Sequence, residues 1–216
     1  MPVSIVIYIL TAVGAYFLGS IPTGYLVARA RGVEIRSLGS GNIGATNVFR
    51  YLGLPAGILV LFCDALKGYV AVMLSRMLLL RLTPSAGEVM IDSVMILAAL
   101  CAVLGHNYTF WLRFKGGKGI ATSAGVLVAL VPAAFVVILV VWAIVLATTR
   151  YMSLASVLGA ATLPFAVWAT TGNITLIIVT AAMSILAIFK HRSNIKRLLN
   201  GTETRFGKKP IPPTTP

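Results

Sequence analysis

The chain is dominated by apolar runs that are long enough to cross a membrane. Residues 3–28, 54–80 and 92–112 form three such runs, and residues 81–91 between the last two read as an outer loop. An α-helix rises about 1.5 Å per residue, so about 20 apolar residues span the hydrocarbon core of a bilayer. The first half of the sequence therefore predicts three transmembrane helices.

The second half contains one run whose interpretation depends on a proline. Residues 120–147 are too long for one untilted span, and Pro132 interrupts them. We divide the run near Pro132 into two short segments, and the sequence leaves open whether these are two tilted spans or a re-entrant hairpin. Residues 151–171 and 174–189 supply two more spans. The predicted fold class is all-α: a polytopic membrane protein with about seven transmembrane helices.

Composition agrees with this pattern, and charge sets the orientation. Of 216 residues, 58% are hydrophobic and 11% charged, and the formal net charge is +13; the mean hydropathy is +0.95. A basic excess is compatible with nucleic acid, anionic lipid or phosphorylated substrates, but seven spans put 15 of the 18 Lys and Arg residues on one side. The positive-inside rule makes that side cytoplasmic and the N-terminus external. The N-terminus lacks a basic n-region and a cleavage site, so we expect a first span rather than a cleaved signal peptide.

Two cysteines and a pair of opposite charges lie inside the apolar runs. Cys63 and Cys101 are too few for a disulfide framework, and we interpret both as packing residues. Asp64 and Lys67 are three residues apart and share one helical face. Charges at mid-membrane cost roughly 2.5–3.5 kcal/mol each, so these two either form a structural ion pair or face a polar interior.

The first polar segment, residues 36–50, reads RSLGSGNIGATNVFR and follows the first span. Gly39, Gly41 and Gly44 permit positive φ and close approach, so backbone N–H groups can converge on an anion. This segment therefore predicts a phosphate-binding loop on the cytoplasmic face.

Two further polar segments are expected on the same face. Residues 105–119 read GHNYTFWLRFKGGKG, with Lys118 among glycines at the start of an apolar helix, whose N-terminus favours anions. Residues 190–199 form a short basic amphipathic helix, which Asn200 and Gly201 cap. We expect disorder from Gly207 to the end of the chain.

Common catalytic arrangements are absent from the sequence. The spacing Gly39-x-Gly41-x-x-Gly44 follows a membrane span and no βαβ unit, so it is a chance match to a dinucleotide fingerprint. The only two histidines have no metal-ligand spacing, and Ser40 lies in no nucleophile elbow. His106 has Trp111 five residues on, so the His-x-x-x-x-Asp pattern is missing. Basic groups and amides without an obvious general base suit an activated, anionic substrate.

Three segments together resemble the signature motifs of the bacterial acyl-phosphate:glycerol-3-phosphate acyltransferases. These are SLGSGNIGATNVFR (37–50), GHNYTFWLRFKGGKG (105–119) and HRSNIKRLLNGTETR (191–205), and the match follows the whole chain in order. The resemblance implies transfer of a fatty acyl group from acyl phosphate to the 1-position hydroxyl of glycerol 3-phosphate. The products are lysophosphatidic acid and phosphate, in the first step of phospholipid biosynthesis at the cell inner membrane. It implies acyl phosphate, glycerol 3-phosphate and membrane lipids as partners, and no cofactor, metal, nucleic acid or obligate protein partner.

The resemblance also implies the site residues. The candidate catalytic residues are those that neutralise phosphate or lie near the attacking hydroxyl: Ser40, Arg50, Lys118, His191 and Asn194. The candidate substrate- and phosphate-binding residues supply amides, hydroxyls and close backbone approach: Ser37, Gly39, Gly41, Asn42, Gly44, Thr46, Asn47, His106, Asn107 and Gly117. The general base, either His191 or a substrate phosphate oxygen, stays open, as does the loop that binds each phosphate. The other polar residues have roles outside the chemistry: we expect Arg192 and Arg197 to contact lipid headgroups and Glu203 to form a salt bridge. His106 has the alternative role of hydrogen-bonding a backbone carbonyl.

Two functions of other classes stay open from the residues alone. A transporter for a phosphorylated solute would use the interrupted segment around Pro132 as a discontinuous helix, although no internal repeat is found and the polar residues gather on one face. A non-catalytic lipid-binding protein accounts for the charge but not for the Asn and Gly content of the loops. We expect one transmembrane domain, residues 1–206, followed by the tail 207–216. Acyl-chain preference and oligomeric state have no signal in the sequence.

Overall fold

A computed structural model describes residues 3–207, and all regular secondary structure in that range is helical. The chain forms ten α-helices there, together with the 3₁₀ turns η1 (Ile35–Ser37) and η2 (Phe110–Leu112). The α-helices are α1 (Val3–Ser20), α2 (Thr23–Arg29), α3 (Ala45–Leu52), α4 (Leu54–Leu82), α5 (Glu88–Asn107), α6 (Ile120–Leu130), α7 (Pro132–Thr149), α8 (Met152–Thr171), α9 (Ile174–Lys190) and α10 (Arg192–Leu199). Of the predicted tail, residues 207–216, Gly207 lies in a turn and residues 208–216 lie outside the described range.

Every predicted apolar run is largely helical, although Ile21 and Pro22 divide the first run into α1 and α2. The helices differ in length. Within residues 3–207, five segments are long and apolar enough to cross a membrane, and a sixth is obtained if α9 and α10, which bend by 58°, count as one. The remaining run, α6, has only 11 residues and reaches partway across, as expected for the segment before Pro132. The protein is therefore an all-helical, multi-pass membrane protein.

Two boundaries differ from the sequence prediction. The third span begins at Glu88 rather than at residue 92, and α4 continues to Leu82, so the connection between α4 and α5 is only residues 83–87. Gly87 is the N-cap, and Glu88 lies in the first turn of α5, where a negative charge is favourable. Helix α5 itself ends at Asn107, and the apolar span continues through η2 to Leu112, the predicted end.

The break at Pro132 has a local cause. Val131 lies between α6 and α7 at φ −144° and ψ 65°, outside the helical region. The ring of a proline disfavours the α conformation for the preceding residue, and proline itself is tolerated at the first position of a helix. The chain therefore ends one helix and starts another within one residue.

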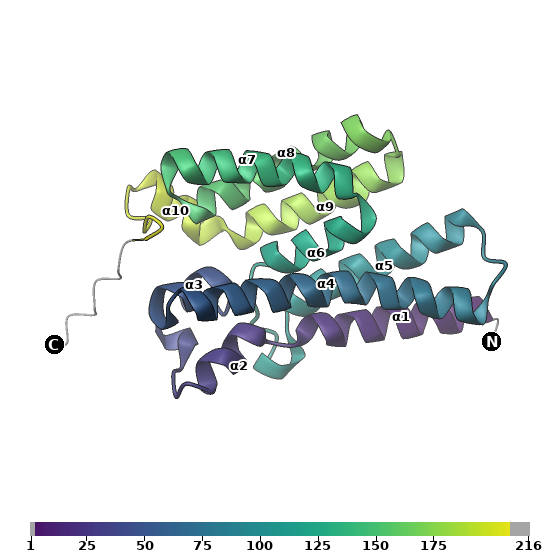
Figure 1. The fold of residues 1–216 in the computed structure, drawn as a ribbon, viewed down its shortest axis with the longest axis horizontal. Coiled ribbons are helices and arrows are strands. Elements are labelled where there is room, and N and C mark those ends of the chain that lie inside the picture. Colours follow the sequence, from purple (N-terminus) through teal and green to yellow (C-terminus); the bar gives the residue numbers. More distant parts are fainter. Residues whose placement is uncertain (1–2, 208–216) are drawn as a thin grey trace.

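The helices form two groups side by side, as Figure 1 shows, with α1 to α6 below and α7 to α10 above. Within the lower group α1 packs on α5, and α4 packs on α6; in the upper group α8 packs on both α7 and α9. Gly125 of α6 lets two backbones meet, because a Cβ there would lie 1.8 Å from the carbonyl oxygen of Ala65. Met183 of α9 joins buried residues of α4 and α5 in one core, so the two groups are in contact.

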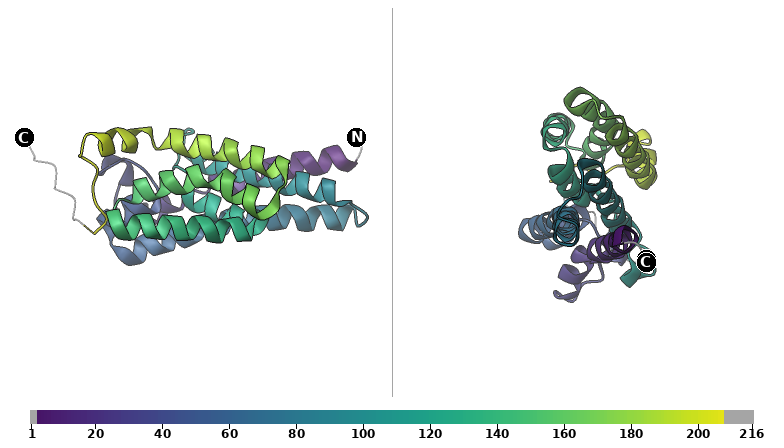
Figure 2. Two further views of the ribbon diagram at one scale, coloured as in Figure 1. Left: turned by 90° about the horizontal axis from the view of Figure 1, so that it is seen from above. Right: turned by 90° about the vertical axis from the view of Figure 1, so that its right-hand side faces the viewer.

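The three polar segments gather at one end of the bundle. α2, α3 and α10 lie together at the left of Figure 1, whereas the turn between α4 and α5 lies at the opposite end. The two views of Figure 2 show the long helices of both groups running along one common axis. Residues of all three segments line one cavity, so the predicted convergence is present in the fold.

Candidate active site

The first polar segment is shaped by two asparagine side chains. Asn47, buried in α3, donates through Nδ2 to the carbonyl oxygens of Leu38 (3.0 Å) and Ile35 (3.4 Å) and accepts from the backbone N–H of Ser40 (3.3 Å). Asn42 Oδ1 accepts from the Gly44 N–H at 2.8 Å. The side chain of Asn47 is therefore occupied by holding the loop.

Glycines complete this loop, and its other predicted residues lie around them. Gly39 has φ +56°, and a Cβ on it would lie 2.7 Å from the ring of Tyr51, so only glycine fits. Gly41 also has positive φ, and Gly44 is the N-cap of α3. Ser37 is exposed and donates to the Glu34 carbonyl oxygen, and Thr46 is half-buried in the first turn of α3. Ser37 is therefore turned toward its own loop.

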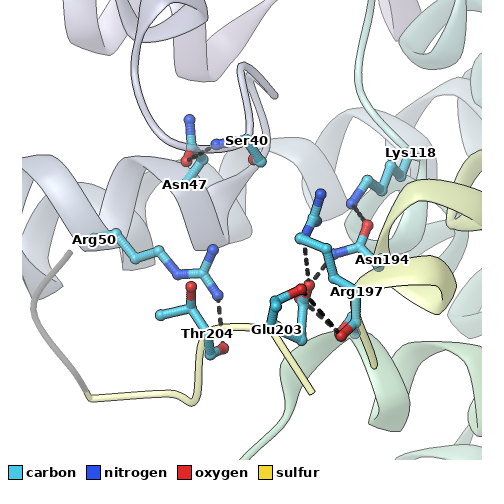
Figure 3. Close-up of polar contacts among 10 residues, drawn as sticks. Ser40, Asn47, Arg50, Lys118, Asn194, Arg197, Glu203 and Thr204 are labelled. Carbon is cyan, nitrogen blue, oxygen red and sulfur yellow. Dashed lines mark hydrogen bonds and ion pairs between the residues drawn. The ribbon is translucent and has the colours of Figure 1, made fainter. Parts of the chain in front are cut away.

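The second segment brings Lys118 against the third. The Gly117 N–H donates to the His106 carbonyl oxygen at 3.0 Å, which closes the turn before Lys118. Lys118 Nζ then donates to Asn194 Oδ1 in α10, as Figure 3 shows. This contact joins the two groups of helices at the polar end of the bundle.

Asn194 belongs to a buried network centred on a carboxylate. Its Nδ2 donates to Glu203 Oε1 at 2.8 Å, and the same oxygen accepts from Ser153 Oγ at 2.8 Å. Arg197 Nε donates to Glu203 Oε2 at 2.7 Å, which confirms the predicted salt bridge of Glu203 (Figure 3). The carboxylate fixes the orientation of the Asn194 amide, so that its oxygen faces Lys118.

His191 lies at the bend between α9 and α10 and is buried. Its Nδ1 is 2.8 Å from the Ala187 carbonyl oxygen. A carbonyl oxygen can only accept, so Nδ1 carries the hydrogen and donates. Nε2 of the neutral ring is then a hydrogen-bond acceptor.

Arg50 reaches the site from α3. Its Nη2 donates to the Thr204 carbonyl oxygen at 3.0 Å, in the segment that follows α10 (Figure 3). The neighbouring Phe49 stacks on Phe206 with ring centroids 4.8 Å apart. The first and third polar segments are thus joined directly, with Arg50 at their contact.

A polar cavity of about 200 Å³ lies where the segments meet. It is lined by residues of all three: Ser40, Asn42, Gly116, Gly117, Lys118, Lys190, Arg192 and Ser193. Four of these were predicted from the sequence, and Arg192, which we expected at lipid headgroups, is a lining residue. Sequence reasoning missed Gly116, Lys190 and Ser193 as site residues; the available signal was their position beside Gly117, His191 and Asn194. A larger hollow of about 470 Å³ lies along the surface of α4 between Met73 and Arg81, away from the three segments.

Burial tunes the charges of the site. It lowers the pKa of Lys118 to about 8 and also lowers the pKa of Arg50. Burial would raise the pKa of Glu203, but hydrogen bonds from Asn194, Arg197 and Ser153 outweigh it, so the pKa of that carboxyl is below its usual value. An anion bound near Lys118 would favour its ammonium form. Glu203 therefore stays negatively charged, and the most favourable place for a bound anion is beside Lys118.

Two predicted residues lie behind the cavity instead of lining it. His106 and Asn107 are 4% and 0% exposed at the end of α5. A Cβ on Gly117 would lie 2.1 Å from His106 Nε2, and one on Gly119 would lie 2.7 Å from Asn107 Oδ1. The alternative role of His106, bonding a backbone carbonyl, is not what the ring does: its Nδ1 lies 3.0 Å from Lys67 Nζ.

The comparisons with known proteins point to one family. The family model for glycerol-3-phosphate acyltransferase matches residues 9–201. The chain belongs to the glycerol-3-phosphate acyltransferase family. Among the relatives, the glycerol-3-phosphate acyltransferase of Geobacter sulfurreducens is 48% identical over 198 residues, which cover 92% of this chain and 96% of that protein. That of Geotalea daltonii is 46% identical over 198 residues, covering 92% and 97%.

Solved structures of the same family have the same fold. PlsY, an integral membrane glycerol 3-phosphate acyltransferase, is 37% identical in its glycerol 3-phosphate form, with a TM-score of 0.83 over 93% of this chain and 96% of that one. Its lysophosphatidic acid form is also 37% identical, with a TM-score of 0.80 over 93% and 95%. Membership of this acyltransferase family favours the enzyme interpretation over a transporter or a lipid-binding protein.

Proposed function

We propose that this protein transfers a fatty acyl group from acyl phosphate to the 1-position hydroxyl of glycerol 3-phosphate. The products are lysophosphatidic acid and inorganic phosphate, and the reaction is the first step of phospholipid biosynthesis. Support comes from the relatives named glycerol-3-phosphate acyltransferase and from the related PlsY structures in glycerol 3-phosphate and lysophosphatidic acid forms. The observation that carries the proposal is a cationic cavity at the junction of three segments, with Arg50 close by.

Both substrates carry phosphate, so the site must hold two anions. Lys118, Lys190 and Arg192 line the cavity, and Arg50 lies where the first and third segments meet. Charge-assisted hydrogen bonds from Lys and Arg to phosphate are about twice as strong as neutral ones. The hydroxyl and amide groups of Ser40, Asn42 and Ser193 in the lining add neutral donors. This set of groups suits two phosphates that lie near one another.

The cavity is suited to the polar parts of the substrates. Its volume, about 200 Å³, is below the range of about 300–1,000 Å³ for pockets that enclose drug-sized ligands. A fatty acyl chain is apolar and too long for this cavity. The adjoining helices are apolar, and their outer faces are mostly exposed. We infer that the acyl chain lies between helices in the bilayer, with only its phosphate and carbonyl in the site.

The chemistry needs no covalent acyl-enzyme. The 1-position hydroxyl oxygen attacks the acyl carbonyl carbon, the bond between that carbon and the bridging phosphate oxygen breaks, and the hydroxyl proton ends on the released phosphate. Cations around the leaving phosphate stabilise the charge that develops as this bond breaks. Lys118, held by Asn194, is the residue proposed for this role. Holding both substrates in one orientation supplies the remaining advantage over reaction in solution.

Two acceptors can take the proton on its way to phosphate. Nε2 of His191 is an acceptor in the neutral ring, because Nδ1 donates to Ala187. Among the described residues, the carboxylates of Glu34, Asp64 and Glu203 are engaged in ion pairs, and those of Glu88 and Asp92 lie at the start of α5, at the opposite end of the bundle. A phosphate oxygen of the substrate is therefore the other acceptor. His191→Gln, which lacks a basic nitrogen, separates the two routes: its kcat falls by orders of magnitude only if His191 is the base.

The proposed location is the cell inner membrane, with the N-terminus outside and the active site and C-terminus in the cytoplasm. The basic residues at the polar end support this orientation through the positive-inside rule. A cytoplasmic site would meet soluble glycerol 3-phosphate directly. Cysteine labelling from each side of sealed vesicles at exposed Lys115→Cys tests the orientation, and labelling only from the external side would reverse it.

The direct test is turnover by the purified protein in detergent or vesicles. With acyl phosphate and labelled glycerol 3-phosphate, labelled lysophosphatidic acid is expected, and acyl-CoA in place of acyl phosphate should give none. Formation of product from acyl-CoA at a comparable rate would refute the proposed donor. Uptake of glycerol 3-phosphate into sealed vesicles without any product would support a transporter instead.

A further inference from the structure

A buried trio of charged and polar groups lies behind the candidate site and has no part in the chemistry described above. Lys67 Nζ, in α4, is 2.7 Å from Asp64 Oδ1 and 3.0 Å from His106 Nδ1, and it donates to the Ile21 carbonyl oxygen at 2.7 Å. Asp64, Lys67 and His106 are 1%, 6% and 4% exposed. The ammonium group thus has two hydrogen-bond partners, the Ile21 carbonyl oxygen and His106 Nδ1, and one ion-pair partner, Asp64. The arrangement joins α4, α5 and the break between α1 and α2.

The ammonium group fixes the state of the histidine. Lysine can only donate, so His106 Nδ1 accepts and the hydrogen of the neutral ring is on Nε2. Nε2 faces the glycine turn: a Cβ on Gly117 would lie 2.1 Å from it. The His106 carbonyl oxygen accepts the Gly117 N–H at 3.0 Å, and a Cβ on Gly116 would lie 2.0 Å from that oxygen. Ring and backbone of His106 together form the surface on which the turn rests.

The next residue continues the same support. Asn107 is fully buried, and both polar atoms of its side chain lack a hydrogen-bond partner among the described residues. A Cβ on Gly119 would lie 2.7 Å from Asn107 Oδ1, so the amide lies directly under Gly119. Lys190, a lining residue of the cavity, donates to the Asn107 carbonyl oxygen at 3.0 Å. His106 and Asn107 thus contact the glycines on both sides of Lys118.

We propose that Lys67 is a positioning residue for the reaction: through His106 it sets the Gly116–Gly119 turn and thereby the place of Lys118 in the site. None of Asp64, Lys67 and His106 lines the cavity, so the trio acts through the turn and touches no substrate. This inference rests on the proposed function, because Lys118 contacts substrate only in that account. It also explains why an ion pair occurs in a membrane span, where each charge is costly.

The main variant removes the charges together. Asp64→Asn combined with Lys67→Met leaves no uncompensated buried charge. Either substitution alone would leave one buried charge without its partner and would destabilise the bundle strongly. A misplacement of about 1 Å at a reacting group costs about 100-fold, so kcat/KM for glycerol 3-phosphate should fall about 10- to 100-fold while the thermal unfolding midpoint changes by only a few degrees. The matched control is Ser75→Ala: Ser75 is buried in the same helix and bonds only the Ala71 carbonyl oxygen of that helix. It should keep wild-type kinetics.

A second variant separates positioning from simple support of the fold. In His106→Asn the amide oxygen takes the place of Nδ1 and still accepts from Lys67, but no atom reaches Gly117. The protein should fold normally and still lose at least about tenfold in kcat/KM. If His106→Asn keeps wild-type activity, the trio is structural only and the proposal fails. This variant decides the matter even if the double variant does not fold.

Coupling to Lys118 gives the sharpest readout. When Asp64→Asn and Lys67→Met are introduced into a Lys118→Met protein, kcat/KM should fall by less than about twofold beyond the loss caused by Lys118→Met alone. The effects of residues that act through the same group are not additive. Independent losses that multiply would overturn the proposal. Binding of inorganic phosphate by calorimetry repeats the comparison without turnover, with the same loss expected in the double variant. An inactive wild type that still binds phosphate would refute the proposed function alone, whereas unchanged phosphate binding in the double variant would refute the positioning role.

Discussion

Replacement of Lys118 by methionine removes the charge at the centre of the site and keeps most of the side-chain volume. Lys118 is half-buried, lines the cavity and donates to Asn194 Oδ1. A hydrogen bond to a charged group contributes about 1.5–3 kcal/mol. Two unit charges 4 Å apart attract by about 4 kcal/mol at an effective dielectric of about 20. A loss of about 3–4 kcal/mol in transition-state stabilisation lowers kcat/KM by about 100- to 1,000-fold.

The assay is incorporation of labelled glycerol 3-phosphate into lysophosphatidic acid by protein purified in one detergent. Lys115→Met is the matched control, because Lys115 is exposed on the same turn and does not line the cavity; it should keep wild-type kcat/KM. Lys118→Arg retains the charge with a different hydrogen-bond geometry, so it should fall between the two. A well-folded Lys118→Met protein whose kcat/KM is within threefold of wild type would refute the role of this lysine.

Three further predictions follow from the same contacts. First, the pKa of Lys118 is lowered to about 8, so the ammonium form is lost as pH rises through that value; kcat/KM measured against pH should fall above about pH 8 in wild type but not in Lys118→Arg. A flat wild-type profile up to pH 10 would contradict this. Second, Glu203→Ala leaves three donors without their acceptor and should reduce stability by about 3 kcal/mol, with Glu203→Gln milder; equal thermal unfolding midpoints for Glu203→Ala and wild type would argue against the network. Third, Asn47→Ala removes the bonds that hold the first loop, so kcat/KM should fall at least about tenfold, whereas unchanged kinetics would show that the loop keeps its shape without them.

The architecture was largely predictable because the hydrophobic pattern and one proline carry it. The apolar runs became helices, and the break at Pro132 lies where the proline excludes a helical conformation for Val131. The helix start at Glu88 was missed by four residues, because Pro84, Gly87 and Glu88 resemble a loop in composition. Gly87 as N-cap was the available signal for that boundary.

The candidate site was predictable as a set of segments and less so as a set of contacts. Glycines and basic residues marked the three segments, but sequence spacing does not tell which side chains face the ligand. Asn47 looks like a phosphate donor in the sequence and instead holds the loop backbone. His106 contacts Lys67, 39 residues earlier in the chain. Arg192 was expected at lipid headgroups and instead lines the cavity, just after the 58° bend between α9 and α10.

The most direct test of the account is phosphate release followed in time with a known amount of purified protein. Acyl phosphate alone should release no phosphate above the uncatalysed rate, because the account contains no acyl-enzyme. Addition of glycerol 3-phosphate should start release, with one lysophosphatidic acid formed for each phosphate. A burst of phosphate equal to the amount of protein before glycerol 3-phosphate is added, or phosphate release without lysophosphatidic acid afterwards, would contradict direct acyl transfer between two bound phosphates.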